Sequence, residues 1–243
     1  MLSDDLRGIW YIMLKDLRAY YFKPPNISWG ILFPFAFVLA FVIRDPGNLD
    51  SLVPGLLALT LLFGTSSMEA IVVTFELRVG ALERLLLAPL RLPALLAAKL
   101  LGGMVFGLVT TLGVLIVALA IFGTNGVNWL LLSMGMILSA AAFSALGVLV
   151  SVSVKEVFEA QTLANAFRFP MMFLGGVFVP VMSLPLGLQI VARALPLTYA
   201  VEVLHTAMAG GGLPLAILDL VVLAAFTVVF FGFATWTLAR RVS

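Results

Sequence analysis

A short charged segment, Glu76-Leu-Arg-Val-Gly80-Ala-Leu-Glu83-Arg84-Leu-Leu-Leu-Ala-Pro89-Leu-Arg91, separates two long apolar stretches of this 243-residue chain. Charge is sparse elsewhere: 63% of the residues are hydrophobic, 11% are charged, and the mean hydropathy is +1.17. Soluble globular chains carry about 25% charged residues. The composition therefore predicts an integral membrane protein in which this segment contacts something outside the bilayer.

The apolar stretches predict an all-α, polytopic membrane protein with six transmembrane helices. A spanning helix needs about 20 largely apolar residues, and the uninterrupted runs exclude the two-residue alternation of a membrane β-barrel. The predicted spans are Ile27–Ile43, Leu52–Phe75, Leu92–Phe122, Val127–Val154, Thr162–Val179 and Leu213–Leu238.

Lysine and arginine fall mainly on one side of these spans. That side holds Arg7, Lys15, Arg18, Lys23, Arg78, Arg84, Arg91, Lys99, Lys155, Arg240 and Arg241, and the other side holds Arg44 and Arg193. The positive-inside rule then predicts a multi-pass protein of the plasma membrane with both termini and residues 76–91 in the cytoplasm. The start Met1–Arg7 lacks the plan of a cleaved signal peptide, so we expect it to be retained.

Two further segments have unusual patterns. Apolar residues recur at three-and-four spacing over Ser3–Phe22 before the Pro24-Pro25 break, which predicts an amphipathic helix in the membrane interface. A plain helix packed against the bundle would show the same pattern.

Residues 180–212 hold two short apolar stretches, Leu186–Leu195 and Thr198–Met208, between prolines and glycines. We interpret these as re-entrant helices rather than one kinked span, because a kinked span would place Arg240 and Arg241 outside.

Three ionisable residues, Glu69, Arg168 and Asp219, are predicted to lie at membrane depth, where a charge is costly unless it is paired or hydrated. Glu69 and Arg168 have opposite signs and similar predicted depth, so one hypothesis is an ion pair that fixes two helices or lines a path. The alternative is that each extends to the interface or has another structural partner.

Two motifs resemble the permease subunits of type-2 ATP-binding-cassette (ABC-2) exporters. The first consists of Glu76, Arg78, Gly80, Leu82, Glu83, Leu85 and Pro89, followed by Lys99, and is similar to that family's cytoplasmic coupling helix. The second is Gly175-Gly176-Val-Phe178-Val-Pro180, then Leu184-Pro185, then Leu195-Pro196-Leu197-Thr198-Tyr199-Ala-Val-Glu202, which resembles the fifth-span end and the extracellular re-entrant helices. Ala81 and Ala88 replace the family's usual threonines, and His205 stands where members often have arginine.

The resemblance implies one permease domain over residues 1–243, with an interfacial helix at 1–25, a coupling helix at 76–91 and re-entrant helices at 180–212. It implies separate ATPase subunits that bind ATP and Mg²⁺, and a second permease chain in a homodimer or heterodimer within the lipid bilayer. No nucleic acid and no cofactor in this chain are expected. The expected ATPase-coupling residues are Glu76, Arg78, Gly80, Leu82, Glu83, Arg84 and Pro89. The candidates for a translocation path or gate are Glu69, Arg168, Phe178, Pro180, Tyr199 and Glu202.

The sequence lacks the motifs of several enzyme classes. It contains no G-x-x-x-x-G-K-[ST] segment, so we do not expect this chain to hydrolyse ATP alone. The chain has one histidine and no cysteine, too few ligands for a zinc site built from nitrogen and sulfur atoms, so no metal is expected. The remaining alternatives are an autonomous secondary transporter or channel, a membrane scaffold and, with least support, an intramembrane enzyme. The exporter interpretation allows an amphipathic, lipid-like, drug or glycan substrate.

Overall fold

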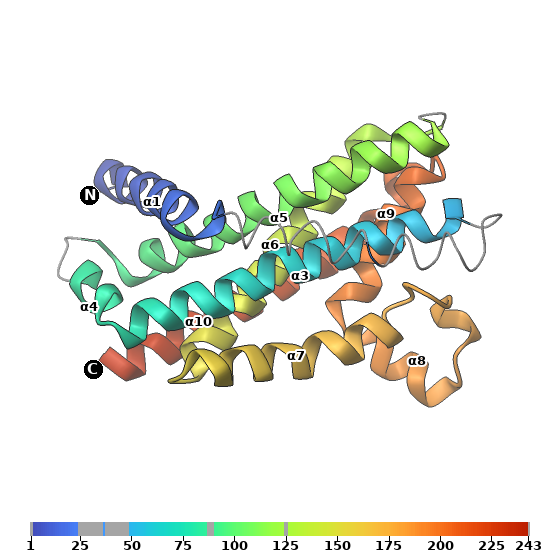
Figure 1. Cartoon of the computed structure of the whole chain (residues 1–243). Coiled ribbons are helices and arrows are strands. Elements are labelled where there is room, and N and C mark those ends of the chain that lie inside the picture. The colour runs from blue at the N-terminus through green and yellow to red at the C-terminus, as the bar shows by residue number, and fades with distance from the viewer. Residues whose placement is uncertain (1, 24–35, 37–48, 87–89, 124–125, 243) are drawn as a thin grey trace.

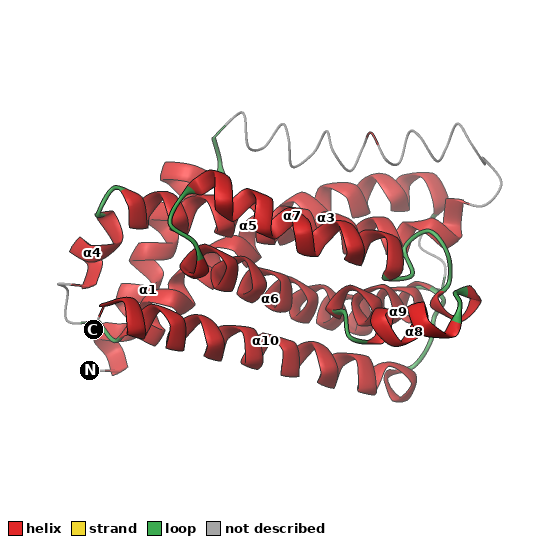
Figure 2. Cartoon of the chain, turned by 90° about the horizontal axis from the view of Figure 1, so that it is seen from below, coloured by secondary structure: helices red, strands yellow, loops and turns green. Residues whose placement is uncertain are grey.

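The computed structural model describes residues 2–23, 36, 49–86, 90–123 and 126–242. Every regular element within these ranges is helical, which confirms the all-α part of the predicted fold class. The long helices run side by side as an elongated bundle (Figures 1 and 2). Both ends of the chain lie at the end of the bundle that holds helix α4, which we call the α4 end (Figure 1).

The helices follow one another without long irregular segments between them in the described ranges. In chain order they are α1 (Leu2–Asp16), the π-helical turn η1 (Leu17–Tyr21), α3 (Leu49–Arg78), α4 (Ala81–Leu86), α5 (Leu92–Phe122), α6 (Trp129–Ser153), α7 (Val157–Leu174), the 3₁₀ turn η2 (Val181–Ser183), α8 (Leu186–Arg193), α9 (Pro196–Met208) and α10 (Leu213–Val242).

Four described helices are long and apolar enough to cross a membrane. The qualifying segments are Leu52–Arg78, Leu92–Ile121, Trp129–Ser153 and Ala216–Arg241, and they match the predicted second, third, fourth and sixth spans. The predicted first span, Ile27–Ile43, lies outside the described residues. Helices α8 and α9 meet at 88° and would add a fifth crossing if the bent pair formed one broken span. Within the described residues, the structure therefore supports four spans, or five if the bent pair is one span.

The predicted fifth span, Thr162–Val179, had the wrong boundaries. Helix α7 begins at Val157 because the Glu159 side chain accepts hydrogen bonds from the backbone N–H groups of Lys155 and Glu156, at 3.2 and 3.3 Å. It ends at Leu174, before Gly175, and Gly176 then has a positive φ of 82°. This helix is also more polar than the four candidate spans.

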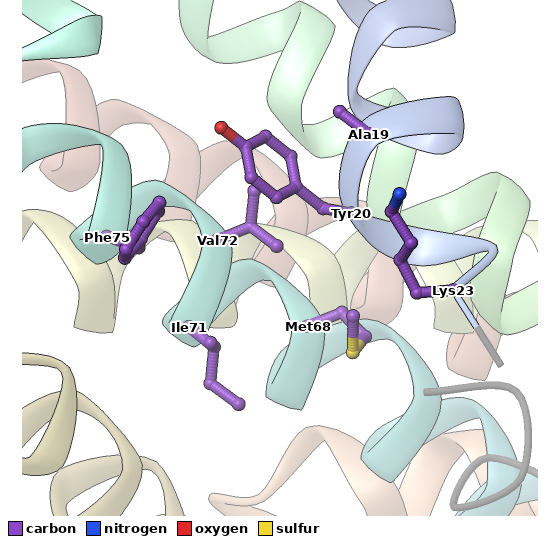
Figure 3. Close-up of a pocket in the computed structure, with 7 residues that line it drawn as sticks. All are labelled: Ala19, Tyr20, Lys23, Met68, Ile71, Val72 and Phe75. Atoms are coloured by element: carbon purple, nitrogen blue, oxygen red, sulfur yellow. The ribbon is translucent and has the colours of Figure 1, made fainter. Parts of the chain in front are cut away.

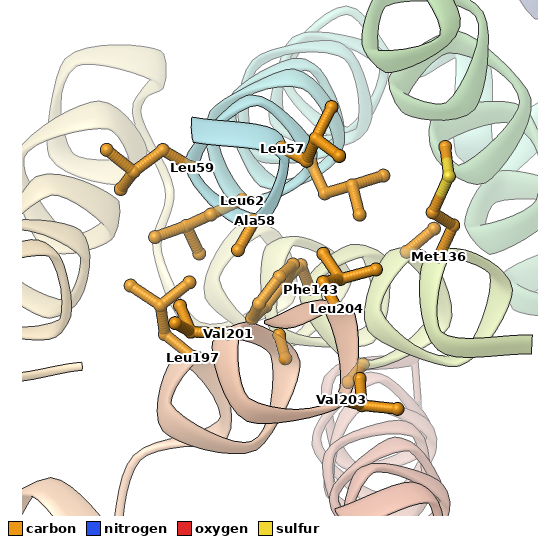
Figure 4. Close-up of a cluster of buried hydrophobic side chains, with 14 of the residues drawn as sticks. Leu57, Ala58, Leu59, Leu62, Met136, Phe143, Leu197, Val201, Val203 and Leu204 are labelled. Carbon is orange, nitrogen blue, oxygen red and sulfur yellow. The ribbon is translucent and has the colours of Figure 1, made fainter. Parts of the chain in front are cut away.

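Helix α6 occupies the centre of the bundle, where it contacts α3, α5, α9 and α10. Small residues allow this close packing. A Cβ atom added at Gly147 would lie 2.9 Å from the backbone Cα and O atoms of Ser66 on α3. In addition to this contact between Gly147 and Ser66, large side chains of α3, α6 and α9 form the main core, including Leu57, Phe143 and Leu204 (Figure 4). The helices are thus joined by direct contact of small residues and by this apolar core, with two smaller apolar clusters beside it.

Candidate functional site

The predicted coupling segment 76–91 is not one helix. Glu76 and Arg78 belong to the last turn of α3, and the chain then turns at Gly80, whose φ of +68° is a conformation that favours glycine. Helix α4 follows as a separate short helix. Its Leu82 is fully buried and packs in a cluster with Ile12 of α1 and Leu95 of α5. Leu82 therefore anchors α4 in an apolar cluster to which α1 and α5 also contribute.

Four charged side chains, Lys15, Asp16, Glu76 and Lys99, lie together on α1, α3 and α5, and we call them the buried ion cluster. The Lys99 ammonium donates to Asp16 Oδ2 at 2.6 Å and also to Glu76 Oε2. Lys15 donates to Glu76 Oε1 at 2.7 Å and lies 2.9 Å from Asp16 Oδ1. The cluster thereby connects the end of α1, the end of α3 and the first turns of α5.

The buried ion cluster balances its charges although three of its four side chains are fully buried. The side chains of Lys99, Asp16 and Glu76 have no exposed surface, whereas that of Lys15 is 43% exposed. Burial lowers the pKa of Lys15, but the hydrogen bonds to Glu76 and Asp16 outweigh it, so the net pKa lies above the usual 10.5. Two ammonium groups then neutralise two carboxylates, which is the condition under which buried charge is tolerated.

The outer rim of this region carries two exposed ion pairs. Arg78 Nη1 lies 3.1 Å from Glu156 Oε2, which joins the end of α3 to the α6–α7 connection. Arg91 Nε lies 3.8 Å from Asp5 Oδ2, which joins the start of α5 to α1. Exposed pairs of this kind contribute about 0–1 kcal/mol each. These two ion pairs therefore join neighbouring helices but contribute little to the free energy of unfolding.

Three predicted coupling residues are not placed at the level of side chains. Glu83 and Arg84 belong to α4, but their side chains lie outside the described set, and Pro89 lies outside the described residues. Their predicted role therefore stays a prediction.

A mostly apolar groove lies between η1 and α3 (Figure 3). It is lined by Ala19, Tyr20, Lys23, Met68, Ile71, Val72 and Phe75.

The hypothesis of a Glu69–Arg168 ion pair was wrong. Glu69 Oε1 accepts a hydrogen bond of 2.6 Å from the Tyr21 hydroxyl, on the side of α3 that faces α5. Arg168 Nε instead donates to Ser66 Oγ at 2.8 Å, and its Nη1 donates to Asn165 Oδ1 at 3.0 Å. Both charged residues are buried. They have separate partners because Glu69, on α3, meets Tyr21 of η1, whereas Arg168 reaches α3 from α7.

At the opposite end of the bundle, the predicted gate residues Tyr199 and Glu202 fasten α8 to α9. The Tyr199 hydroxyl donates to the Arg193 carbonyl, and Arg193 Nη1 donates to Glu202 Oε2, both at 2.7 Å. Phe178 packs partly against the main core, and Pro180 is exposed immediately before η2. These contacts establish a braced helix pair, and the gating role stays a prediction.

Sequence reasoning missed that Asp16 and Tyr21 belong to the buried polar contacts. Both lie at the end of the N-terminal helical segment and are fully buried. The available signal was Lys99, which stands eight residues into an otherwise apolar helix and therefore requires an acidic partner. That requirement could have directed attention to the few carboxylates near the same membrane side.

These features define a multi-pass, α-helical membrane protein with short helices packed at both ends of its bundle. The chain belongs to the ABC-2 type transporter family, whose model matches residues 7–209. The family match covers most of the chain and places it among membrane transporter proteins.

Curated relatives include the protein named inner membrane transport permease YadH in Escherichia coli K12, which is 28% identical over 163 residues. The permeases of the same name in Escherichia coli O157:H7 and Shigella flexneri show the same identity over the same length. The match covers 66% of this chain and 62% of each relative, so it spans less than two thirds of the relatives' length.

Proposed function

We propose that this chain is the permease subunit of an ATP-driven exporter. It forms the translocation path for an amphipathic, lipid-like, drug or glycan substrate, together with a second, identical or different, permease chain. Separate ATPase subunits bind ATP and Mg²⁺ and supply the energy. The name of the relatives favours the plasma membrane. The shared position of both chain ends and the excess of lysine and arginine at the α4 end favour cytoplasmic termini.

The observation that supports this function best is the buried ion cluster, which involves the same helices that hold α4. Leu82 of α4 packs in an apolar cluster with α1 and α5, and the buried ion cluster joins α1, α3 and α5 through charge-assisted hydrogen bonds. Such bonds are short and directional. A displacement of α4 by a docked partner would therefore be transmitted to two candidate spans at once, which is what coupling to an external ATPase requires.

The test is the ATPase activity of the partner subunit reconstituted with this chain in lipid vesicles. We expect the chain to stimulate the ATPase, and we expect Glu83→Ala with Arg84→Ala to abolish the stimulation. Lys155→Ala is the matched control, because Lys155 is an exposed cation on the α6–α7 connection near the α4 end. All complexes are checked for assembly by size-exclusion chromatography.

Two results would reject the proposal. The first is full stimulation by an assembled complex of the double variant, which would remove α4 from the coupling path. The second is substrate transport by vesicles that contain this chain and no ATPase. That outcome would establish the alternative, an autonomous secondary transporter or channel.

A further inference from the structure

Two fully or almost fully buried cations of the described residues have different polar partners. Lys99 lies between the carboxylates of Asp16 and Glu76. Arg168 is buried to 1% exposure, yet within the described residues its hydrogen bonds go only to the neutral oxygens of Ser66 and Asn165. Its Nη2 atom has no hydrogen-bond partner there. A positive charge and an unused N–H donor group thus remain at this position.

Arg168 lies near the middle of the membrane. Its partner Ser66 is the fifteenth residue of the 27-residue candidate span Leu52–Arg78. With a rise of about 1.5 Å per residue, Ser66 lies about 18 Å from the end of that span, in a hydrocarbon core about 30 Å thick. An arginine at this depth that keeps its charge without a counter-ion is costly, and such residues mark substrate or ion pathways.

Apolar surface lies beside Arg168 and on the exposed side of the helix that carries it. The Phe63 ring centroid, on α3, lies 5.6 Å from the guanidinium carbon. On α7 itself, Phe167, Phe169 and Phe173 are exposed by 43%, 46% and 61%. A guanidinium presents planar, paired donors that suit phosphate, sulfate or carboxylate groups, whereas exposed phenyl rings suit an alkyl chain. The combination matches a ligand with an anionic headgroup and an apolar tail.

We propose that Arg168 binds the anionic headgroup of an amphiphilic substrate, with Nη2 as its free donor. This inference rests on the proposed transport function and specifies the substrate class. Because the guanidinium is enclosed by α3 and α7, the headgroup reaches it when these helices separate. Ser66 and Asn165 hold the side chain in place while the site is empty.

The experiment is photolabelling of the full-length chain in maltoside micelles, without any ATPase. One probe is a hexadecyl phosphate with a terminal diazirine, and its matched neutral probe is the corresponding hexadecanol. Labelled positions are mapped by peptide mass spectrometry. We expect the phosphate probe to label α7 and α3, and we expect Arg168→Met to reduce this labelling about tenfold or more. Arg241→Met, which removes an exposed arginine at the chain end, is expected to leave it unchanged.

A second variant keeps the test valid if Arg168→Met does not fold. Ser66→Ala leaves the arginine charged and removes its internal acceptor, so labelling by the phosphate probe should stay equal or rise. Equal labelling by the neutral probe would overturn the proposal, as would undiminished labelling of folded Arg168→Met. Complete displacement by inorganic phosphate would overturn the amphiphile assignment. Since no ATPase is present, this test and the coupling test can fail independently.

Discussion

Replacing Lys99 with methionine would test the buried ion cluster directly. The substitution keeps an unbranched side chain of similar length but removes the ammonium that bonds to Asp16 and Glu76. Two fully buried carboxylates would then share only Lys15, which is 43% exposed. Removing one partner of a buried pair costs about 3–5 kcal/mol, because an uncompensated charge stays behind. We expect the free energy of unfolding to fall by that amount.

The loss of two charge-assisted hydrogen bonds gives a similar figure. Each such bond contributes about 1.5–3 kcal/mol, so two bonds together contribute about 3–6 kcal/mol. The measurement is unfolding in mixed micelles by titration with dodecyl sulfate, followed by circular dichroism. Lys155→Met is the matched control, because that lysine is exposed and its replacement should change the free energy of unfolding by less than about 0.5 kcal/mol.

A triple variant separates the charge effect from general damage to the site. Asp16→Leu, Glu76→Met and Lys99→Met together remove every buried charge of the cluster, and replacement of a whole buried ionic group by apolar residues is often neutral. We expect the triple variant to regain most of the stability that Lys99→Met alone loses. The reasoning would be refuted by a loss below about 1 kcal/mol in Lys99→Met, or by a triple variant no more stable than the single one.

Two further predictions concern packing and pH. Gly147→Ala should destabilise the protein by about 1–3 kcal/mol, because the new Cβ would lie 2.9 Å from the Ser66 backbone. The control Gly113→Ala, with nothing within 4 Å of its Cβ, should be neutral or stabilising in the same unfolding assay. Equal losses of stability in both variants would contradict this account. Because the pKa of Lys15 is raised above its usual 10.5 in the folded chain, its stabilising contribution is complete below pH 10.5 and is lost as the pH rises through the folded-state pKa. Unfolding midpoints measured at about pH 8 and about pH 11 should therefore differ more in the wild type than in Lys15→Met, and identical pH responses would exclude this contribution.

The helices with clear end signals could be predicted from the sequence. The prediction Leu92–Phe122 agrees with α5, which begins beside Pro93 and ends at Gly123 with a φ of +83°. The α8–α9 pair was recognised because prolines interrupt an apolar segment too short to cross a membrane twice. Prolines and glycines were sufficient signals in these cases, because they begin or end a helix at the residues next to them.

The long-range polar contacts could not be predicted in the same way. Asp16 and Lys99 are 83 residues apart, and nothing in either local pattern selects the other. The Glu69–Arg168 hypothesis used only depth and sign. It failed because depth and sign do not fix the direction of a side chain: Glu69 accepts from Tyr21, whereas Ser66 accepts from Arg168. The charges showed that partners were needed, and the packing of the helices determined which ones.

The buried ion cluster also imposes an order on the synthesis of this protein. Asp16 leaves the ribosome 83 residues before Lys99, the cation with which it is finally buried. At about 5–20 residues per second, this delay lasts about 4–17 s. During that time the Asp16 carboxylate has only the neighbouring Lys15 as a cationic partner within the buried ion cluster. Burial of Asp16 in its final site therefore follows the arrival of α5, so the first helix to be made docks only after a later one is in place.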